Sequence, residues 1–133
     1  MQRRHRISGS KRHSQIHSDG ASAANKLLVI RFLANGLDHS RFAFVVSKRL
    51  GNAVVRNRIK RRLRESVRIH PLQPGWDAVF IARRGLQNAS FRELSRSVSN
   101  LLRRSSILER DSEAVARGSK NDGVSSKGGD SSE

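Results

Sequence analysis

The chain has 133 residues, with 27 lysines and arginines against 11 acidic residues, and its formal net charge is +16. That length suits one domain with a modest core. The longest apolar runs, Phe42 to Val46 and Ala78 to Ala82, are far shorter than the roughly 20 residues that span a bilayer, which excludes a helical membrane protein. The chain contains no cysteine. This excludes a disulfide framework, a thiolate metal site and a cysteine nucleophile, and it fits a reduced, cytoplasmic setting.

The charge is distributed unevenly along the chain. Residues 109–133 hold four basic and six acidic side chains and carry −2, so residues 1–108 carry +18. This Ser-, Gly- and Asp-rich tail is predicted to be disordered. Residues 1–12 are predicted to form a basic, flexible N-terminus, which leaves a domain over 13–108. Repulsion among so many cations destabilises a compact domain, so we expect a polyanionic partner. Nucleic acid is the leading candidate for this partner, and an anionic membrane surface is the second.

The first half of the domain predicts a short helix followed by two strands. Residues 10–18 have a weak helical pattern, and the apolar run at 27–33 is typical of a strand. A turn signal at Asn35-Gly36 leads into a second strand at 41–47. The two strands are expected to pair as an antiparallel hairpin.

The second half predicts helix, strand and helix. Asn52 can cap a helix over 53–69, which Pro71 prevents from continuing. The nearly continuous apolar run at 77–83 predicts a strand in the interior of the sheet.

The last predicted element is a helix over 91–107. Ser90 and Glu93 have the spacing of a capping box at its start. This order of elements predicts an α/β two-layer sandwich, in which helices pack on one small sheet.

The helix at 53–69 carries the candidate chemistry. At 100° per residue, one face about 100° wide collects an amide and four cations: Asn57, Lys60, Arg61, Arg64 and Arg68. A neighbouring face collects four apolar residues: Val55, Ile59, Leu63 and Val67. The helix is therefore expected to pack its apolar face on the sheet and to present a row of cations beside it.

A solvated charged face is the usual explanation for helical lysines and arginines. It predicts mixed signs, because opposite charges four residues apart stabilise a helix and like charges destabilise it. Here Lys60 and Arg64 are like-charged neighbours, as are Arg64 and Arg68. The pattern therefore favours a surface that binds phosphates.

The segment at 47–52 leads from a strand into a helix N-terminus, where unpaired N–H groups can hold a phosphate. It lacks the GxxxxGK[ST] spacing of a mononucleotide P-loop. Gly51 and Asn52 are also explained by a simple turn and cap, and both explanations can hold together.

No catalytic arrangement is visible among the side chains of the domain. Its few acids lack the spacing of paired carboxylates or metal ligands. His13 and His17 are four residues apart and could face one way on a helix, but no metal site is expected without a thiolate. They are either imidazoles that contact a ligand or solvated side chains.

Residues 48–65 read KRLGNAVVRNRIKRRLRE. They closely resemble the signature of the protein subunit of bacterial ribonuclease P, K-x-x-G-N-A-V-x-R-N-x-x-K-R-x-x-R-E. Short matches to the family also occur at Arg6-Ile7, at 20–22, at 24–26 and at Ala82-Arg83. The resemblance covers residues 6 to about 108 and leaves only the tail outside.

The resemblance implies a ribonucleoprotein endonuclease that removes the 5′ leader from precursor tRNA. In that family the RNA subunit holds the active site and the Mg²⁺ ions that drive hydrolysis, so no catalytic side chain is expected in the protein. The implied fold has the order α-β-β-β-α-β-α with a left-handed β-α-β crossover, similar to the second domain of ribosomal protein S5. It requires a short strand before Leu27.

The motif match and the cationic face together give the residues expected to contact the RNA subunit: Lys48, Arg49, Gly51, Asn52, Arg56, Asn57, Lys60, Arg61, Arg64 and Arg68. The family holds the leader in a cleft between the sheet and the first helix, lined with aromatic residues. This chain has His13, His17 and Arg31 at those positions. The resemblance therefore implies leader binding through imidazole and guanidinium stacking.

Two other classes of protein share some of these features. A structural RNA-binding protein of the ribosomal type would have the same composition, but the motif at 56–65 favours ribonuclease P. A membrane-surface protein would expose large apolar residues opposite its cations, whereas Val55, Ile59 and Leu63 are needed here for the core.

Overall fold

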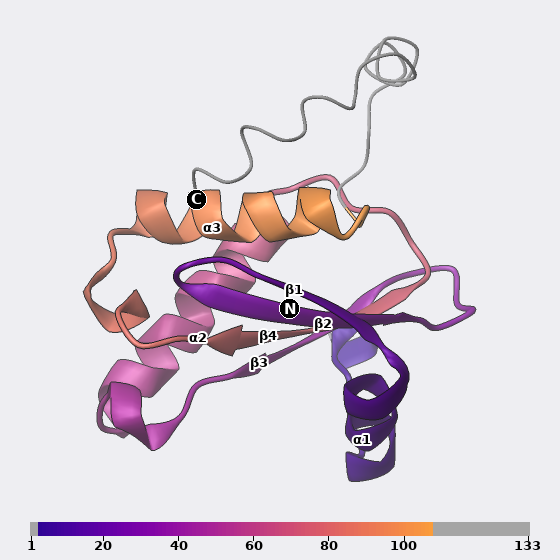
Figure 1. The fold of residues 1–133 in the computed structure, drawn as a ribbon, viewed down its shortest axis with the longest axis horizontal. Coiled ribbons are helices and arrows are strands. Elements are labelled where there is room, and N and C mark those ends of the chain that lie inside the picture. The colour runs from indigo at the N-terminus through magenta and orange to yellow at the C-terminus, as the bar shows by residue number, and fades with distance from the viewer. Residues whose placement is uncertain (1–2, 108–133) are drawn as a thin grey trace, which may run out of the picture.

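The computed structural model describes residues 3–107, and the tail predicted over 109–133 lies outside these residues. The described part forms a four-stranded mixed sheet with α2 and α3 on one face and α1 on the other (Figure 1). The helices are α1 (Ser10–Asp19), α2 (Ala53–Arg68) and α3 (Phe91–Arg104). The strands are β1 (Ala21–Ala24), β2 (Leu28–Ala34), β3 (Arg41–Val45) and β4 (Trp76–Ala82). This confirms the predicted α/β sandwich and the order of its elements, with β1 as the short strand before Leu27.

The predicted hairpin between the strands at 27–33 and 41–47 is wrong. The sheet order is β1-β2-β4-β3, so β4 lies between β2 and β3, antiparallel to the first and parallel to the second. The apolar run of β4 is buried on both faces, which is the environment of a central strand. The connection from β2 to β3 passes over the start of β4, where Asn35 N–H donates to the carbonyl of Gly75 (2.9 Å) and Ser40 Oγ donates to that of Gln73 (2.7 Å).

The parallel strands β3 and β4 are joined through α2, which forms the β-α-β crossover of the fold. The predicted cap of α2 is confirmed, because Asn52 Oδ1 accepts from Val55 N–H at 3.0 Å. The helix ends at Arg68, before Pro71. The capping box of α3 is also confirmed, with both hydrogen bonds between Ser90 and Glu93 present.

The helix α3 ends three residues before the predicted boundary at 107. Ser106 has a left-handed φ of 65°, and its N–H donates to the carbonyl of Arg103 at 3.1 Å. Ile107 N–H donates to the carbonyl of Leu102 at 2.9 Å, and its side chain is fully buried. These are the two hydrogen bonds of a Schellman motif. Serine holds the left-handed position where glycine is usual, so the sequence carried no stop signal.

The main core lies between the sheet and the pair α2 and α3, around Phe80, Ile30, Leu63 and Leu101. A smaller cluster on the opposite face joins Ile16 of α1 to Val79 and Ile7. The folded part therefore begins before the predicted domain start at residue 13. Arg6 forms an isolated parallel bridge with Phe42, and α1 itself begins at Ser10. No helix within residues 3–107 combines the length and apolarity needed to cross a membrane.

Candidate nucleic-acid interface

The two faces predicted for the second helix are confirmed in α2. Ile59, Leu63 and Val67 are buried against the sheet and α3, and Val55 is half-buried. The cationic face comprises Asn57, Lys60, Arg61, Arg64 and Arg68, all exposed or half-buried. We call these five residues the α2 stripe.

The charges of the α2 stripe are nearly uncompensated. Arg68 Nη2 lies 2.9 Å from Glu65 Oε1, and both side chains are more than half exposed. Lys60, Arg61 and Arg64 make no hydrogen bond or ion pair with any residue between 3 and 107. A helix that leaves three neighbouring like charges unpaired has a surface suited to a polyanion.

The turn before α2 is fixed by its backbone. Gly51 has a φ of 150°, and a Cβ built there would lie 2.8 Å from side-chain atoms of Val55, so only glycine fits. Arg56 Nε donates to the Gly51 carbonyl at 3.1 Å, so this predicted contact residue also holds the turn. Leu50 is buried beneath it, while Lys48 and Arg49 are exposed. The turn thus presents two cations beside the N–H groups that begin α2.

A hollow of about 240 Å³ joins the α2 stripe to the edge strand β3. Lys60 and Arg64 form one side of it, and Phe42 and Phe44 lie on the other. Arg6, from the N-terminal segment, completes its rim. The motif match did not include Arg6, Phe42 or Phe44 among the candidate contacts. One signal in the sequence could have indicated this hollow. Lys60 and Arg64 are four residues apart and border the apolar face of α2, so both could have been expected to lie next to a strand of the sheet.

The candidate leader residues form a separate group on the α1 side of the sheet. Arg31, on β2, donates from Nη1 to the carbonyl of His17 at 3.2 Å. His17 is exposed and His13, one turn earlier on α1, is half-buried. The structure therefore brings Arg31 and the end of α1 together, on the face of the sheet that α2 and α3 do not cover.

A buried ion cluster centred on Asp77 fixes α1 to this face. The Asp77 carboxylate is fully buried and accepts from Arg12 Nε at 2.7 Å, from Arg41 Nε at 2.8 Å and from Arg41 Nη2 at 2.6 Å. Asn35 Nδ2 donates to it at 2.9 Å. Burial alone would raise the pKa of Asp77, but the hydrogen bonds from Arg41, Asn35 and Arg12 outweigh it and lower that pKa below its ordinary value. Sequence reasoning missed this cluster, because the partners of Asp77 lie 36 to 65 residues away from it in the chain.

Close backbone packing fixes the other end of α1. Gly20 N–H donates to the Ile16 carbonyl at 3.0 Å. A Cβ at Gly20 would lie 2.7 Å from the Phe32 carbonyl oxygen. Helix α1 is therefore held at both ends, which places His13 and His17 at a defined position beside β2.

The described residues contain no group of three His, Asp or Glu side chains placed to share a metal ion. What residues 3–107 offer is an unpaired cationic helix face, a turn with free N–H groups and a second polar group under α1. These features define a small α/β protein with a surface suited to a polyanion.

Comparison with known proteins identifies the family within this class. The family model for ribonuclease P matches residues 1–106. The ribonuclease P protein component of Clostridioides difficile is 40% identical over 108 residues, which cover 77% of this chain and 95% of that protein. That of Dehalococcoides mccartyi strain CBDB1 is 40% identical over 116 residues, covering 87% and 97%.

A solved structure gives the same answer for the fold. It is described as that of a Staphylococcus aureus RNase P protein mutant with defective mRNA degradation activity. It is 31% identical to this chain and superposes with a TM-score of 0.74 over 79% of this chain and 91% of that one. The chain belongs to the ribonuclease P protein family, whose members are components of a tRNA-processing ribonucleoprotein.

Proposed function

We propose that this chain binds the RNA subunit of ribonuclease P through the α2 stripe and the turn before it, and holds the 5′ leader of precursor tRNA beside α1. The observation that carries the proposal is the α2 stripe, where Lys60, Arg61 and Arg64 are unpaired within residues 3–107 of a chain in this family. A phosphate backbone supplies the missing counter-charges, and the counterions that it releases add to the affinity.

Each part of the turn has a separate task in this proposal. Lys48 and Arg49 contact phosphates, while Gly51 and Asn52 hold the backbone so that the first N–H groups of α2 face the same RNA segment. Arg56 stabilises the turn through the hydrogen bond that its Nε donates to the Gly51 carbonyl.

In this proposal the protein positions RNA and does no bond-breaking chemistry. Mg²⁺ held by the RNA subunit would supply the chemistry of hydrolysis, while the side chains of this chain would hold the RNA in place.

The leader would lie along α1 and β2. His13 and His17 face it from one turn of α1, and the Arg31 guanidinium faces it from β2. Unpaired bases can stack on imidazole and guanidinium planes, and a leader phosphate can pair with the guanidinium.

A second candidate is cleavage of RNA by the protein alone. It is suggested by the similar Staphylococcus aureus protein, one mutant of which is described as defective in mRNA degradation activity. The two candidates differ in one requirement, because only the first needs the RNA subunit.

Reconstitution separates them. The protein is combined with a bacterial ribonuclease P RNA at low Mg²⁺, and cleavage of precursor tRNA is compared with RNA alone and with protein alone. The proposal predicts leader removal in the combined sample only, and weaker stimulation when Lys60 and Arg64 are changed to Gln.

The control variant is Arg103→Gln, which removes one exposed charge from the last turn of α3. Cleavage by nuclease-free protein alone, abolished by a point substitution in that protein, would support the second candidate. Equal stimulation by the α2 and Arg103 variants would contradict the assigned role of the α2 stripe.

A further inference from the structure

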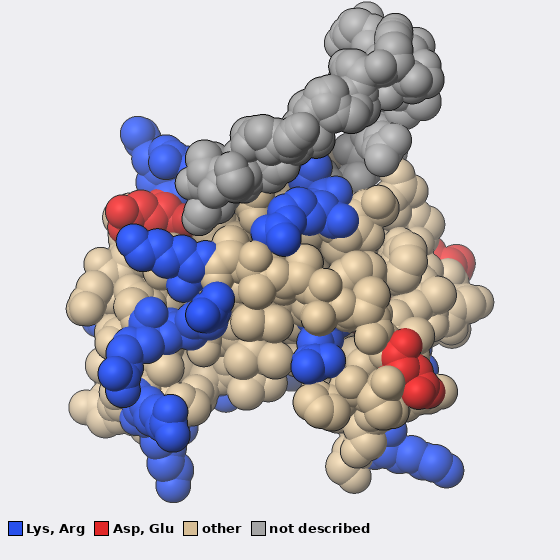
Figure 2. Space-filling model, viewed as in Figure 1, with Lys and Arg blue, Asp and Glu red and all other residues tan. Residues whose placement is uncertain are grey.

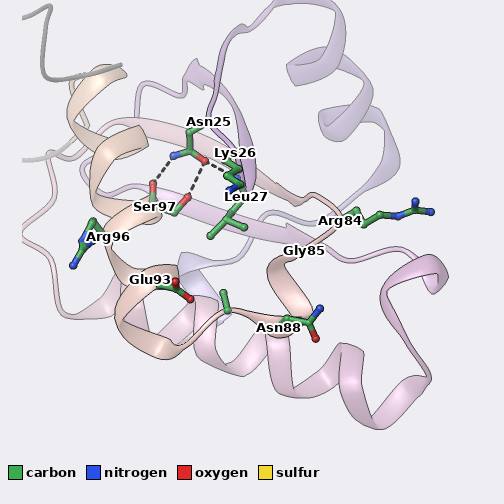
Figure 3. A pocket seen from close by; sticks show the side chains of 10 residues that line it. Asn25, Lys26, Leu27, Arg84, Gly85, Asn88, Glu93, Arg96 and Ser97 are labelled. Carbon is green, nitrogen blue, oxygen red and sulfur yellow. Dashed lines mark hydrogen bonds between the residues drawn. The ribbon is translucent and has the colours of Figure 1, made fainter. Parts of the chain in front are cut away.

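A second polar hollow lies on the α2 and α3 side of the sheet. It has a volume of about 440 Å³, and we call it the turn pocket (Figure 3). Its walls come from the turn between β1 and β2, the connection between β4 and α3, and the first two turns of α3. The family match included Asn25 and Lys26 of that first turn, and neither has a role in the function proposed above.

The wall of the turn pocket is rigidly built around Asn25. Its Nδ2 donates to the Ser97 carbonyl and to Asn100 Oδ1, both at 3.1 Å. Its Oδ1 accepts from Ser97 Oγ at 2.8 Å (Figure 3) and from Leu28 N–H at 3.0 Å. Because every polar atom of this side chain is used internally, Asn25 acts as a scaffold that fixes Lys26 at the rim.

Three cations on three different segments surround the turn pocket: Lys26, Arg84 and Arg96. None of them makes a hydrogen bond or ion pair within residues 3–107. The one acid of the wall, Glu93, is engaged in the capping box, where its Oε1 accepts from Ser90 N–H at 2.9 Å. The pocket therefore keeps a net positive charge and has unused donors.

The arrangement of these cations favours an extended ligand. Arg84 and Arg96 lie at opposite ends of the turn pocket, and Asn88 lies at the Arg84 end (Figure 3). Cations on separate segments around one hollow suit the successive phosphates of a nucleic-acid strand better than a single phosphate.

We propose that the turn pocket binds the backbone of a segment of the RNA subunit, as a second contact beyond the α2 stripe. This inference rests on the proposed function. The RNA subunit is the occupant, rather than the leader, because the leader residues lie on the opposite face of the sheet.

The surface is continuous with the turn before α2. Parallel pairing of β3 and β4 brings their carboxyl ends to the same edge of the sheet, so the β4–α3 connection lies near the β3–α2 connection. Lys and Arg side chains gather down this side of the molecule, from the N-terminal end of α3 to that of α2 (Figure 2).

Charge-matched variants test the pocket. Lys26→Gln, Arg84→Gln and Arg96→Gln each remove one charge, as does the control Arg103→Gln, and affinity for the RNA subunit is measured from about 50 to 300 mM salt. For each phosphate that a variant no longer neutralises, the slope of log K against log[salt] should flatten by about 0.7–0.9. The control should flatten it less, because Arg103 lies outside the pocket and the α2 stripe.

The outcomes of this measurement are distinguishable. If the wild-type protein binds the RNA subunit and all three pocket variants match Arg103→Gln, the pocket is a solvated surface and the inference is wrong, while the proposed function stands. If the wild-type protein shows no affinity for the RNA subunit, the proposed function itself is wrong.

A cross-link identifies the occupant directly. The chain has no cysteine, so Asn88→Cys can carry a single photoreactive group at the pocket, and Leu37→Cys can carry the same group at the other end of the sheet. In the holoenzyme with precursor tRNA, we expect Asn88→Cys to cross-link to the RNA subunit and Leu37→Cys to do so much less. Cross-links from Asn88→Cys to precursor tRNA alone, or equal yields at both positions, would overturn the assignment.

Discussion

Replacing Asp77 by Asn should destabilise the fold more than any other single removal of charge among the described acids. The substitution keeps the size of the side chain but removes its charge and turns one acceptor into a donor. Arg12 and Arg41 would then be left partly buried without a counter-charge, with side chains only 21% and 27% exposed. Breaking a buried ion pair from one side costs about 3–5 kcal/mol, a large part of the roughly 5–15 kcal/mol that stabilises a domain.

Urea unfolding followed by far-UV circular dichroism measures this loss. The midpoint should fall at an unchanged m-value, which indicates lost stability without a change in the surface exposed on unfolding. The matched control is Asp38→Asn, in which the same change is made at a side chain that is 89% exposed. Solvent screens Asp38 from its partners, so this control should unfold close to the wild-type protein.

The stabilisation by Asp77 should also depend on pH. Its pKa is lowered in the folded protein, so the stabilisation is fully present above the ordinary aspartate value of about 3.9 and is lost as pH falls below it. The difference between the wild-type protein and Asp77→Asn should therefore shrink in strong acid.

If Asp77→Asn does not fold, Arg12→Gln provides a second variant for the same measurement. It removes one of the four hydrogen bonds to the carboxylate and should cost roughly 1.5–3 kcal/mol. The reasoning is refuted if Asp77→Asn or Arg12→Gln unfolds at the same urea concentration as Asp38→Asn.

Three further predictions concern RNA binding and the tail. Arg61→Ala or Arg64→Ala should flatten the salt dependence of binding to the RNA subunit by about one unit of slope, and an unchanged slope for both would place the α2 stripe away from that RNA. Removing residues 110–133 should leave the urea unfolding transition and RNA-dependent cleavage intact, because the segment has few large apolar residues; loss of a cooperative transition would show otherwise. The affinity advantage of precursor over mature tRNA should fall when His13 and His17 are both changed to Ala, because unpaired leader bases can stack on imidazole rings. An unchanged advantage in this double variant would mean that these histidines do not touch the leader.

Local signals in the sequence were sufficient to predict most of the helices and strands. Asn52 and the Ser90–Glu93 pair mark helix starts because a cap depends on residues within one turn of each other. The two faces of α2 follow from its helical period for the same reason. The interior position of β4 follows from its continuous apolar run.

Features that depend on distant residues could not be predicted in this way. Strand pairing depends on which apolar strand can be buried on both faces. Here that strand is β4, which lies between β2 and β3 although β2 and β3 follow one another in the chain. The Asp77 cluster and the turn pocket each join segments more than 30 residues apart. The candidate RNA contacts all lie on α2 or in the turn before it, where a local motif and the helical period could place them, and their binding of RNA stays a prediction.

The most direct test of the central claim maps what lies against the α2 stripe in the assembled enzyme. Val54 is 74% exposed on the first turn of α2, three residues before Asn57, and is outside the set of proposed contacts. A photoreactive group on Val54→Cys, in active holoenzyme with precursor tRNA, should cross-link to the RNA subunit, and high salt that dissociates the complex should abolish the product. Cross-links to precursor tRNA alone, or none in a holoenzyme that still removes leaders, would contradict the claim that the α2 stripe binds the RNA subunit.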